Sequence, residues 1–163
     1  MKQNRFMNGS ISHNLGIHSE HWQTPIKQWA DYAESVWKGK GRVEEVRDAP
    51  EGFIRRATRS FTDRDIPVVR LRTWVNVMLP DSRDGYDTGY PHVHHDDSAV
   101  TLIHYLRGAG FGQLDIFDRD EVVLSIIPKD GQTIYIPNGV KHGVWRNHGD
   151  HNRVAFIATA YPR

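Results

Sequence analysis

Histidine and aspartate gather in one short stretch of the chain, from Tyr90 to Asp97, which reads Tyr-Pro-His-Val-His-His-Asp-Asp. The chain has ten histidines and no cysteine, so a metal site in it has to use imidazole and carboxylate ligands. Such ligands suit iron, manganese, zinc, copper and nickel. This stretch is therefore the first place to look for a metal centre.

The alternation of side chains along a strand decides which of these groups can lie together. Residues two apart on a strand point to the same face, so His94 can pair with Asp96, or His95 with Asp97. Either pair sets an imidazole beside a carboxylate. One further histidine then completes a set of two histidines and one carboxylate, which leaves positions open on iron(II).

His142 is the best third ligand, because it follows the turn at 137–139 and the strand before that turn can run beside the first. We prefer His94 and Asp96 as the first pair, since Val93 then points outward into apolar packing. The other register of the first pair stays open, and so does the identity of the metal.

Short strands must position these residues. Turn residues rich in glycine, proline, asparagine and aspartate divide the C-terminal part of the chain into apolar segments, a spacing typical of a sandwich or barrel. The expected strands are 68–79, 100–106, 113–117, 121–127, 133–136 and 153–160.

Helices are expected before the strands. Thr24 and Pro25 suit the first positions of a helix, and apolar residues recur at helical spacing over 26–37. A second helix is expected at 51–61. We therefore predict one domain over 1–163, in which a helical part (1–66) supports one face of a mainly β barrel core (67–163).

Composition excludes several classes of protein. No apolar run approaches the roughly 18 residues of a membrane-spanning helix, and the N-terminus lacks a secretory signal. The formal net charge of +1 gives no strong signal for nucleic acid. The absence of cysteine fits a cytoplasmic protein.

From about Thr73 onward, the sequence resembles the iron(II)- and 2-oxoglutarate-dependent oxygenases, especially their prolyl-4-hydroxylase-like branch. The resemblance rests on pieces that occur in the order of the family, namely His94-His95-Asp96 as His-x-Asp, the strand 100–106 with its Tyr105-Leu106, Gly112-Gln113-Leu114 as Gly-Gly-x-Leu, Pro128-Lys129-Asp130-Gly131 as Pro-x-x-Gly, His142 as the distal histidine, and Arg153 eleven residues later.

The resemblance implies a double-stranded β-helix, the jelly-roll barrel that cupins share, and a dioxygenase that hydroxylates its substrate with O₂. It implies that His94, Asp96 and His142 bind Fe(II). It also implies that Arg153, helped by Tyr105, binds the cosubstrate 2-oxoglutarate. The residues do not specify the substrate.

Physical chemistry supports the cosubstrate role of Arg153, because a guanidinium forms paired, charge-assisted hydrogen bonds with a carboxylate. The alternative is an ion pair with Asp115 or Asp118. Tyr105 can donate to the same carboxylate, or be an aromatic core residue.

Two further residues are candidates for the cosubstrate site. Thr101 shares the face of Tyr105 and can line the pocket. Asn76 alternates with Trp74 on the preceding strand and can hydrogen-bond the cosubstrate.

A cupin-type metal enzyme, or a small-molecule binding module, is the competing interpretation. Residues 131–142 also resemble the second cupin motif, and His92-Val93-His94 can supply the His-x-His of the first. The first motif expects a glutamate where this chain has Ser98 and Ala99, which weakens the cupin interpretation. A cupin has no general need for Arg153, so that residue separates the two.

Overall fold

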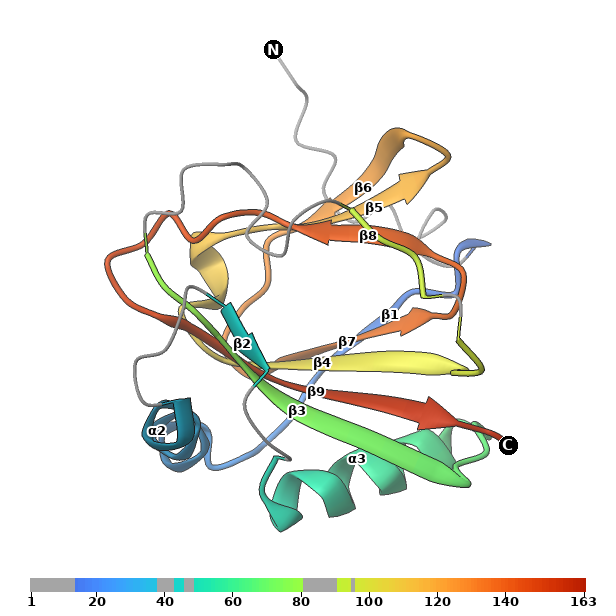
Figure 1. Cartoon of the computed structure of the whole chain (residues 1–163), viewed down its shortest axis with the longest axis horizontal. Coiled ribbons are helices and arrows are strands. Elements are labelled where there is room, and N and C mark those ends of the chain that lie inside the picture. Colours follow the sequence, from blue (N-terminus) through green and yellow to red (C-terminus); the bar gives the residue numbers. More distant parts are fainter. Residues whose placement is uncertain (1–13, 38–42, 46–48, 81–90, 95) are drawn as a thin grey trace.

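Two antiparallel sheets face each other, and two helices cover the outer face of the larger sheet (Figure 1). The computed structural model describes residues 14–37, 43–45, 49–80, 91–94 and 96–163. Within these residues, neither helix combines the length and the hydropathy that a membrane span requires. His95, which belongs to the alternative ligand pair, lies outside the described residues.

The larger sheet has six strands in the order β1-β7-β4-β9-β3-β2, and the smaller has three in the order β6-β5-β8. The strands of the larger sheet are β1 (His18–His21), β2 (Val43–Glu45), β3 (Arg70–Met78), β4 (Val100–Arg107), β7 (Gln132–Pro137) and β9 (Arg153–Tyr161). Those of the smaller sheet are β5 (Leu114–Asp118), β6 (Glu121–Ile126) and β8 (Lys141–Val144). The helices are α2 (Ile26–Trp37), α3 (Glu51–Asp63) and the 3-10 turn η1 (Ala109–Phe111).

The predicted fold class, a mainly β chain with N-terminal helices, is confirmed. Three strands were not predicted, namely β1, β2 and β8. The sequence of β1, His-Ser-Glu-His, has no apolar alternation, and β8 contains Gly143. These strands form by backbone pairing with longer neighbours, which the hydropathy pattern does not record. The N-terminal part is consequently not purely helical, because β1 and β2 extend the larger sheet at its two edges.

Strand β9 lies inside the larger sheet and all nine of its residues are buried. Its alternate residues face opposite sides. Val154 and Phe156 pack in the cluster beneath the helices, whereas Ala155 and Ile157 pack in the cluster between the sheets. A strand that is covered on both faces reads as a nearly continuous apolar run, as β9 does.

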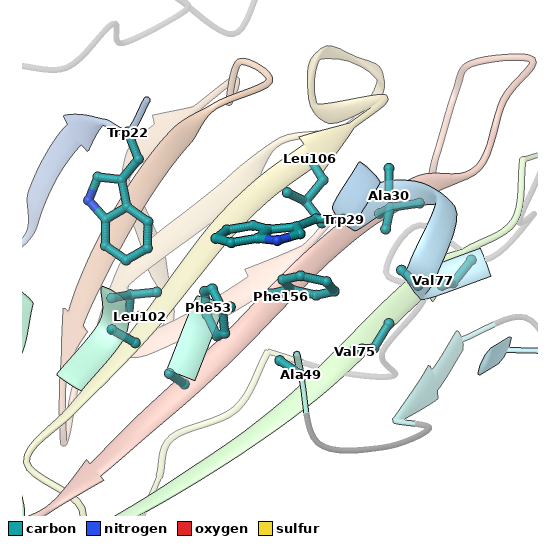
Figure 2. Close-up of a cluster of buried hydrophobic side chains, with 14 of the residues drawn as sticks. Trp22, Trp29, Ala30, Ala49, Phe53, Val75, Val77, Leu102, Leu106 and Phe156 are labelled. Carbon is teal, nitrogen blue, oxygen red and sulfur yellow. The ribbon is translucent and has the colours of Figure 1, made fainter. Parts of the chain in front are cut away.

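The helices attach to the larger sheet through aromatic side chains (Figure 2). Phe53 of α3 lies 5.1 Å from Phe156 and 6.0 Å from Trp29 of α2, measured between ring centroids. Burial of each such side chain contributes about 1.5–3 kcal/mol relative to exposure. The helices therefore brace the sheet from outside and leave its other face to the smaller sheet.

Candidate metal centre

Three histidine side chains converge near the smaller sheet. His92, His94 and His142 each offer a ring nitrogen, and these atoms all lie within 4.8 Å of one another. The ring centroids are 4.4 Å apart for His92 and His142, 5.1 Å for His92 and His94, and 5.3 Å for His94 and His142. Among the described residues, this is the group of histidines and carboxylates that could hold a metal ion.

Backbone pairing sets two of these side chains beside each other. His92 and His142 form an antiparallel bridge, in which each backbone N–H donates to the carbonyl of the other at 2.9 and 3.0 Å. His142 lies in β8, opposite Ile116 of β5. Directly opposed residues of antiparallel strands point to the same face, and Ile116 packs between the sheets. The bridge therefore turns both histidines to the face of the smaller sheet that looks at the larger sheet, where His142 is buried and His92 is exposed.

The proton of His142 is fixed by its backbone partner. Nδ1 lies 2.9 Å from the carbonyl oxygen of Val140, which can only accept a hydrogen bond, so Nδ1 carries the hydrogen and Nε2 has a free lone pair. Burial lowers the pKa of His142 to about 4, so its imidazole is neutral at physiological pH. A histidine that is oriented in this way is prepared to bind a metal through Nε2.

Asp96 makes other contacts. Its carboxylate accepts hydrogen bonds from the Ser98 hydroxyl, from the Ser98 N–H at 3.1 Å and from the Tyr161 hydroxyl at 2.8 Å. The Ser98 hydroxyl, followed by that of Tyr161, lowers the pKa of Asp96 to about 2. The nearby His94 adds a smaller effect in the same direction.

Of the predicted ligands His94, Asp96 and His142, the two histidines belong to the converging group and Asp96 does not. His92 is the third member of that group, where Asp96 was expected. The chain bends at Asp96 and Asp97, so the alternation that was expected to align His94 with Asp96 ends before it reaches the aspartates. The choice of ligands stays a prediction.

The four residues predicted for the cosubstrate share one face of the larger sheet. Tyr105 packs in the cluster between the sheets, and Thr101 lies four residues earlier on the same strand. Arg153 alternates with Ala155 on β9, and Asn76 of β3 lies opposite Ala155. This face of the larger sheet is directed toward the smaller sheet. The histidines lie on the opposite side, at the smaller sheet.

Arg153 is 4% exposed, and its guanidinium is held where two polypeptide segments meet. Its Nη2 donates to the sulfur of Met78 at 2.6 Å and to the carbonyl of Trp145 at 3.1 Å. Met78 lies directly opposite Arg153 in the sheet, and Trp145 follows β8. The guanidinium therefore joins the larger sheet to the segment that continues from His142.

Tyr105 lies close to that guanidinium. Burial raises the pKa of Tyr105 to about 12, although the positive charge of Arg153 acts in the opposite direction. Its hydroxyl consequently stays protonated and can donate a hydrogen bond. Asp115, one of the alternative partners proposed for Arg153, accepts hydrogen bonds from Gln113, Ser125 and Trp145.

Two contributors to the site were not identified as such from the sequence. His92 had a signal, because it lies two residues before His94, but this signal was assigned to the cupin alternative. Met78 had none, since a methionine near the end of an apolar strand is an ordinary core residue. Its place opposite Arg153 depends on the register of β3 and β9.

No family model and no curated protein matches this chain. Solved structures do match it. A prolyl-4-hydroxylase of Pseudomonas putida has a TM-score of 0.61 at 15% identity, over 94% of this chain and 96% of that one. The 2-oxoglutarate complex of a viral collagen prolyl hydroxylase, from Paramecium bursaria Chlorella virus-1, has a TM-score of 0.60 at 15% identity, over 90% and 96%.

A third structure, HygX from Streptomyces hygroscopicus with nickel and 2-oxoglutarate bound, has a TM-score of 0.63 at 13% identity, over 99% of this chain and 87% of that one. The predicted double-stranded β-helix is confirmed by these matches. The predicted resemblance to the prolyl-4-hydroxylase-like branch is confirmed at the level of the fold. Because all three identities are low, the likeness establishes the fold, and the chemistry has to come from the residues themselves.

Proposed function

We propose that this chain is an iron(II)- and 2-oxoglutarate-dependent dioxygenase that hydroxylates a C–H bond of its substrate. The observation that carries the proposal is that histidines that could bind a metal and a buried arginine lie on facing sides of one barrel. His142 belongs to the smaller sheet and Arg153 to the larger one. A fold of this kind is used for many chemistries, so the proposal depends on these side chains.

The donors fit the metal. Imidazole nitrogen suits Fe(II), and His142 has its Nε2 free because Nδ1 donates to Val140. His94 and His142 belong to both ligand sets under consideration, the predicted one with Asp96 and the observed group with His92. Three protein ligands leave positions for a chelating oxo acid and for O₂.

The residues around Arg153 fit the cosubstrate. A thioether is a weak acceptor, so a carboxylate is a much stronger partner for Nη2 than the sulfur of Met78 is. The protonated Tyr105 hydroxyl is a second donor close by. The distal carboxylate of 2-oxoglutarate would bind here, while Thr101 and Asn76 would line the same wall.

When bound, iron(II) and 2-oxoglutarate supply the oxidation, in which the decarboxylation of the oxo acid to succinate accompanies the insertion of oxygen into a C–H bond. The chain's own residues do the rest. The histidines hold the metal, Arg153 and Tyr105 orient the oxo acid, and the apolar side chains between the sheets, among them Ile103 and Ile157, exclude bulk water.

Anaerobic titration of the iron(II)-loaded protein with 2-oxoglutarate tests this proposal. A chelated oxo acid gives a weak visible charge-transfer band, which should appear saturably. The matched variant is Arg153→Ala, which should move saturation to at least about tenfold higher concentration, because hydrogen bonds to charged groups contribute about 1.5–3 kcal/mol. Metal affinity should be unchanged in that variant.

The cupin-type alternative has one specific observation in its favour, because His92, His94 and His142 are the histidines that it requires. Tight metal binding without a charge-transfer band would favour it over the oxygenase. Absence of metal binding would instead favour a binding module. The same titration therefore separates the three functions.

A further inference from the structure

We propose that the metal is bound by three histidines, His92, His94 and His142, and that Asp96 is a structural residue instead of a ligand. This inference rests on the metal centre of the proposed function, and it differs from the set of two histidines and one aspartate that the family resemblance implies. It concerns which side chains bind the metal, whatever oxo acid or substrate is used.

The backbone holds His92 at the metal side of the barrel. His92 and His142 exchange both backbone hydrogen bonds, so they form a directly opposed pair. In such a pair the Cα atoms lie about 5.5 Å apart and the side chains point to the same face. Their ring centroids are 4.4 Å apart, the shortest of the three ring separations in the group. His92 is thus held beside His142 by an isolated backbone bridge at the edge of β8.

His94 is the third member of the group, and it lies close to His92 because the two residues are near each other in the sequence. The two residues are two positions apart, and their rings lie 5.1 Å from each other and nearly perpendicular. The three ring nitrogens lie within 4.8 Å of one another. Two imidazole nitrogens on one ion lie about 3 Å apart when each metal–nitrogen bond is about 2.1 Å. The nitrogens would therefore have to approach one another from their present separations of up to 4.8 Å when the metal binds.

Asp96 already has partners that fix it outside this group. One carboxylate oxygen accepts from the Ser98 N–H and hydroxyl, and the other accepts from Tyr161 at 2.8 Å. The backbone carbonyl of Asp96 also accepts a hydrogen bond from the side-chain amide of Asn138 at 2.9 Å. These three donors already take most of the roughly four acceptor positions of the carboxylate.

The same contacts give Asp96 a structural task. Tyr161 is the last residue of β9 and Asn138 lies in the turn after β7, so the bend at Asp96 is connected to two strands of the larger sheet. Ala99 adds to this connection, because its carbonyl accepts from the Asn138 N–H at 2.9 Å. Asp96 therefore fixes the end of the segment that presents His92 and His94.

Metal affinity of matched variants tests the inference without any turnover. Cobalt(II) binding would be measured by its visible spectrum, in competition with a chelator, for wild type, His92→Ala and Asp96→Asn. Loss of a ligand should exceed the 10- to 100-fold that loss of a supporting hydrogen bond costs, so His92→Ala should bind more than about 100-fold more weakly. Asp96→Asn keeps one acceptor oxygen for Ser98 or Tyr161, so it should weaken cobalt binding by no more than the 10- to 100-fold that loss of a supporting hydrogen bond costs, and by less than His92→Ala does.

Control variants separate ligand loss from damage to the fold. His151→Ala removes a histidine whose side chain is 69% exposed, and it should bind cobalt like wild type. Tyr161→Phe removes one hydrogen bond from Asp96 and leaves every candidate ligand in place, so it too should bind normally. X-ray absorption of the cobalt-loaded wild type counts imidazoles directly, and it should find three.

The opposite pattern overturns the inference. If Asp96→Asn loses cobalt while His92→Ala retains it, or if two imidazoles are counted, Asp96 is the third ligand. A wild type that binds no metal overturns both this inference and the proposed function. A wild type that binds metal through three histidines but never binds 2-oxoglutarate overturns the proposed function alone.

Discussion

The guanidinium of Arg153 lies beside Gly112, in space that any larger residue at that position would occupy. A Cβ atom added to Gly112 would lie 2.0 Å from Nη1 of Arg153 and 2.9 Å from the carbonyl oxygen of Arg146. The φ of Gly112 is −158°, which is ordinary extended backbone, so the need for glycine here is steric. The position of Arg153 at the start of β9 thus depends on the absence of a side chain at Gly112, which follows η1.

Gly112→Ala should therefore displace Arg153 and weaken 2-oxoglutarate binding by at least about tenfold, since the paired hydrogen bonds of the guanidinium would no longer be aligned. Metal affinity should be unchanged, and anaerobic titration of the iron-loaded variant measures both. The matched control is Gly110→Ala, where the added Cβ would meet only the carbonyl oxygen of Pro128 at 3.9 Å. If Gly112→Ala and Gly110→Ala bind 2-oxoglutarate with equal affinity, Arg153 is not part of the cosubstrate site.

Tyr105→Phe should weaken 2-oxoglutarate binding by about tenfold and leave metal binding intact, because one hydrogen bond to a charged carboxylate is removed. The hydroxyl is available as a donor, since burial raises the pKa of Tyr105 to about 12. Tyr135→Phe is the control, because the hydroxyl of Tyr135 contacts Glu20 and Ser60. If Tyr105→Phe binds the oxo acid like wild type, the tyrosine is only a core residue.

His94→Ala should reduce metal affinity far more than His95→Ala, by more than about 100-fold against about twofold, because His94 lies in the converging group. The measurement is the same chelator competition with cobalt(II). The reverse order of the two variants would select the other register of the first ligand pair. His142→Ala should abolish binding in either register.

The fold could be predicted from the sequence wherever apolar side chains repeat with a regular period. Residues 26–37 were expected as a helix, and α2 spans Ile26–Trp37. Strand β8 was not predicted, because it has four residues and owes its place to pairing with β5. Short edge strands carry little hydropathy signal, so their positions follow from their neighbours.

The candidate site could be predicted in part. His94, His142 and Arg153 were selected by residue type and order. His142 and Arg153 lie in the two facing sheets, and the ring of His94 lies 5.3 Å from that of His142. The contacts of Asp96 could not be foreseen, because its partner Tyr161 lies 65 positions away along the chain. Alternation predicts faces only while a strand continues, and the bend at Asp96 ends it.

Phe53→Ala should lower the free energy of unfolding by about 3–5 kcal/mol, as loss of a buried aromatic ring does. Phe53 is 0% exposed and packs against Trp22, Trp29 and Phe156. Urea denaturation of the metal-free protein measures the change. Val122→Ala, at a side chain that is 39% exposed, should change stability by less than about 0.5 kcal/mol. A small effect at Phe53 would contradict the packing of α3 on the sheet.

His104 should make the protein less stable as the pH falls below about 6.5. Its ring is 0% exposed among Trp22, Trp29 and Phe53, and its two nitrogens contact the hydroxyls of Thr24 at 3.0 Å and Thr133 at 2.9 Å. Burial, followed by the nearby charges, lowers the pKa of His104 to about 3. Just below pH 6.5, His104 therefore binds a proton in the unfolded chain, where its pKa is the ordinary 6.5, but not in the folded state.

The sign of the effect follows from these two pKa values. Above pH 6.5, His104 is neutral in both the folded and the unfolded state, so it does not lower the free energy of unfolding. Between pH 6.5 and about 3, His104 gains a proton only in the unfolded state. Each pH unit in that window costs about 1.4 kcal/mol, so His104 should account for about 2 kcal/mol between pH 6.5 and pH 5. Urea denaturation at pH 7.5 and pH 5, with a chelator present, should show a smaller loss in His104→Gln than in wild type by that amount. His142 and the carboxylates titrate in both proteins and cancel in the comparison. Parallel pH profiles would mean that His104 is protonated in the folded state, in contradiction to its apolar surroundings.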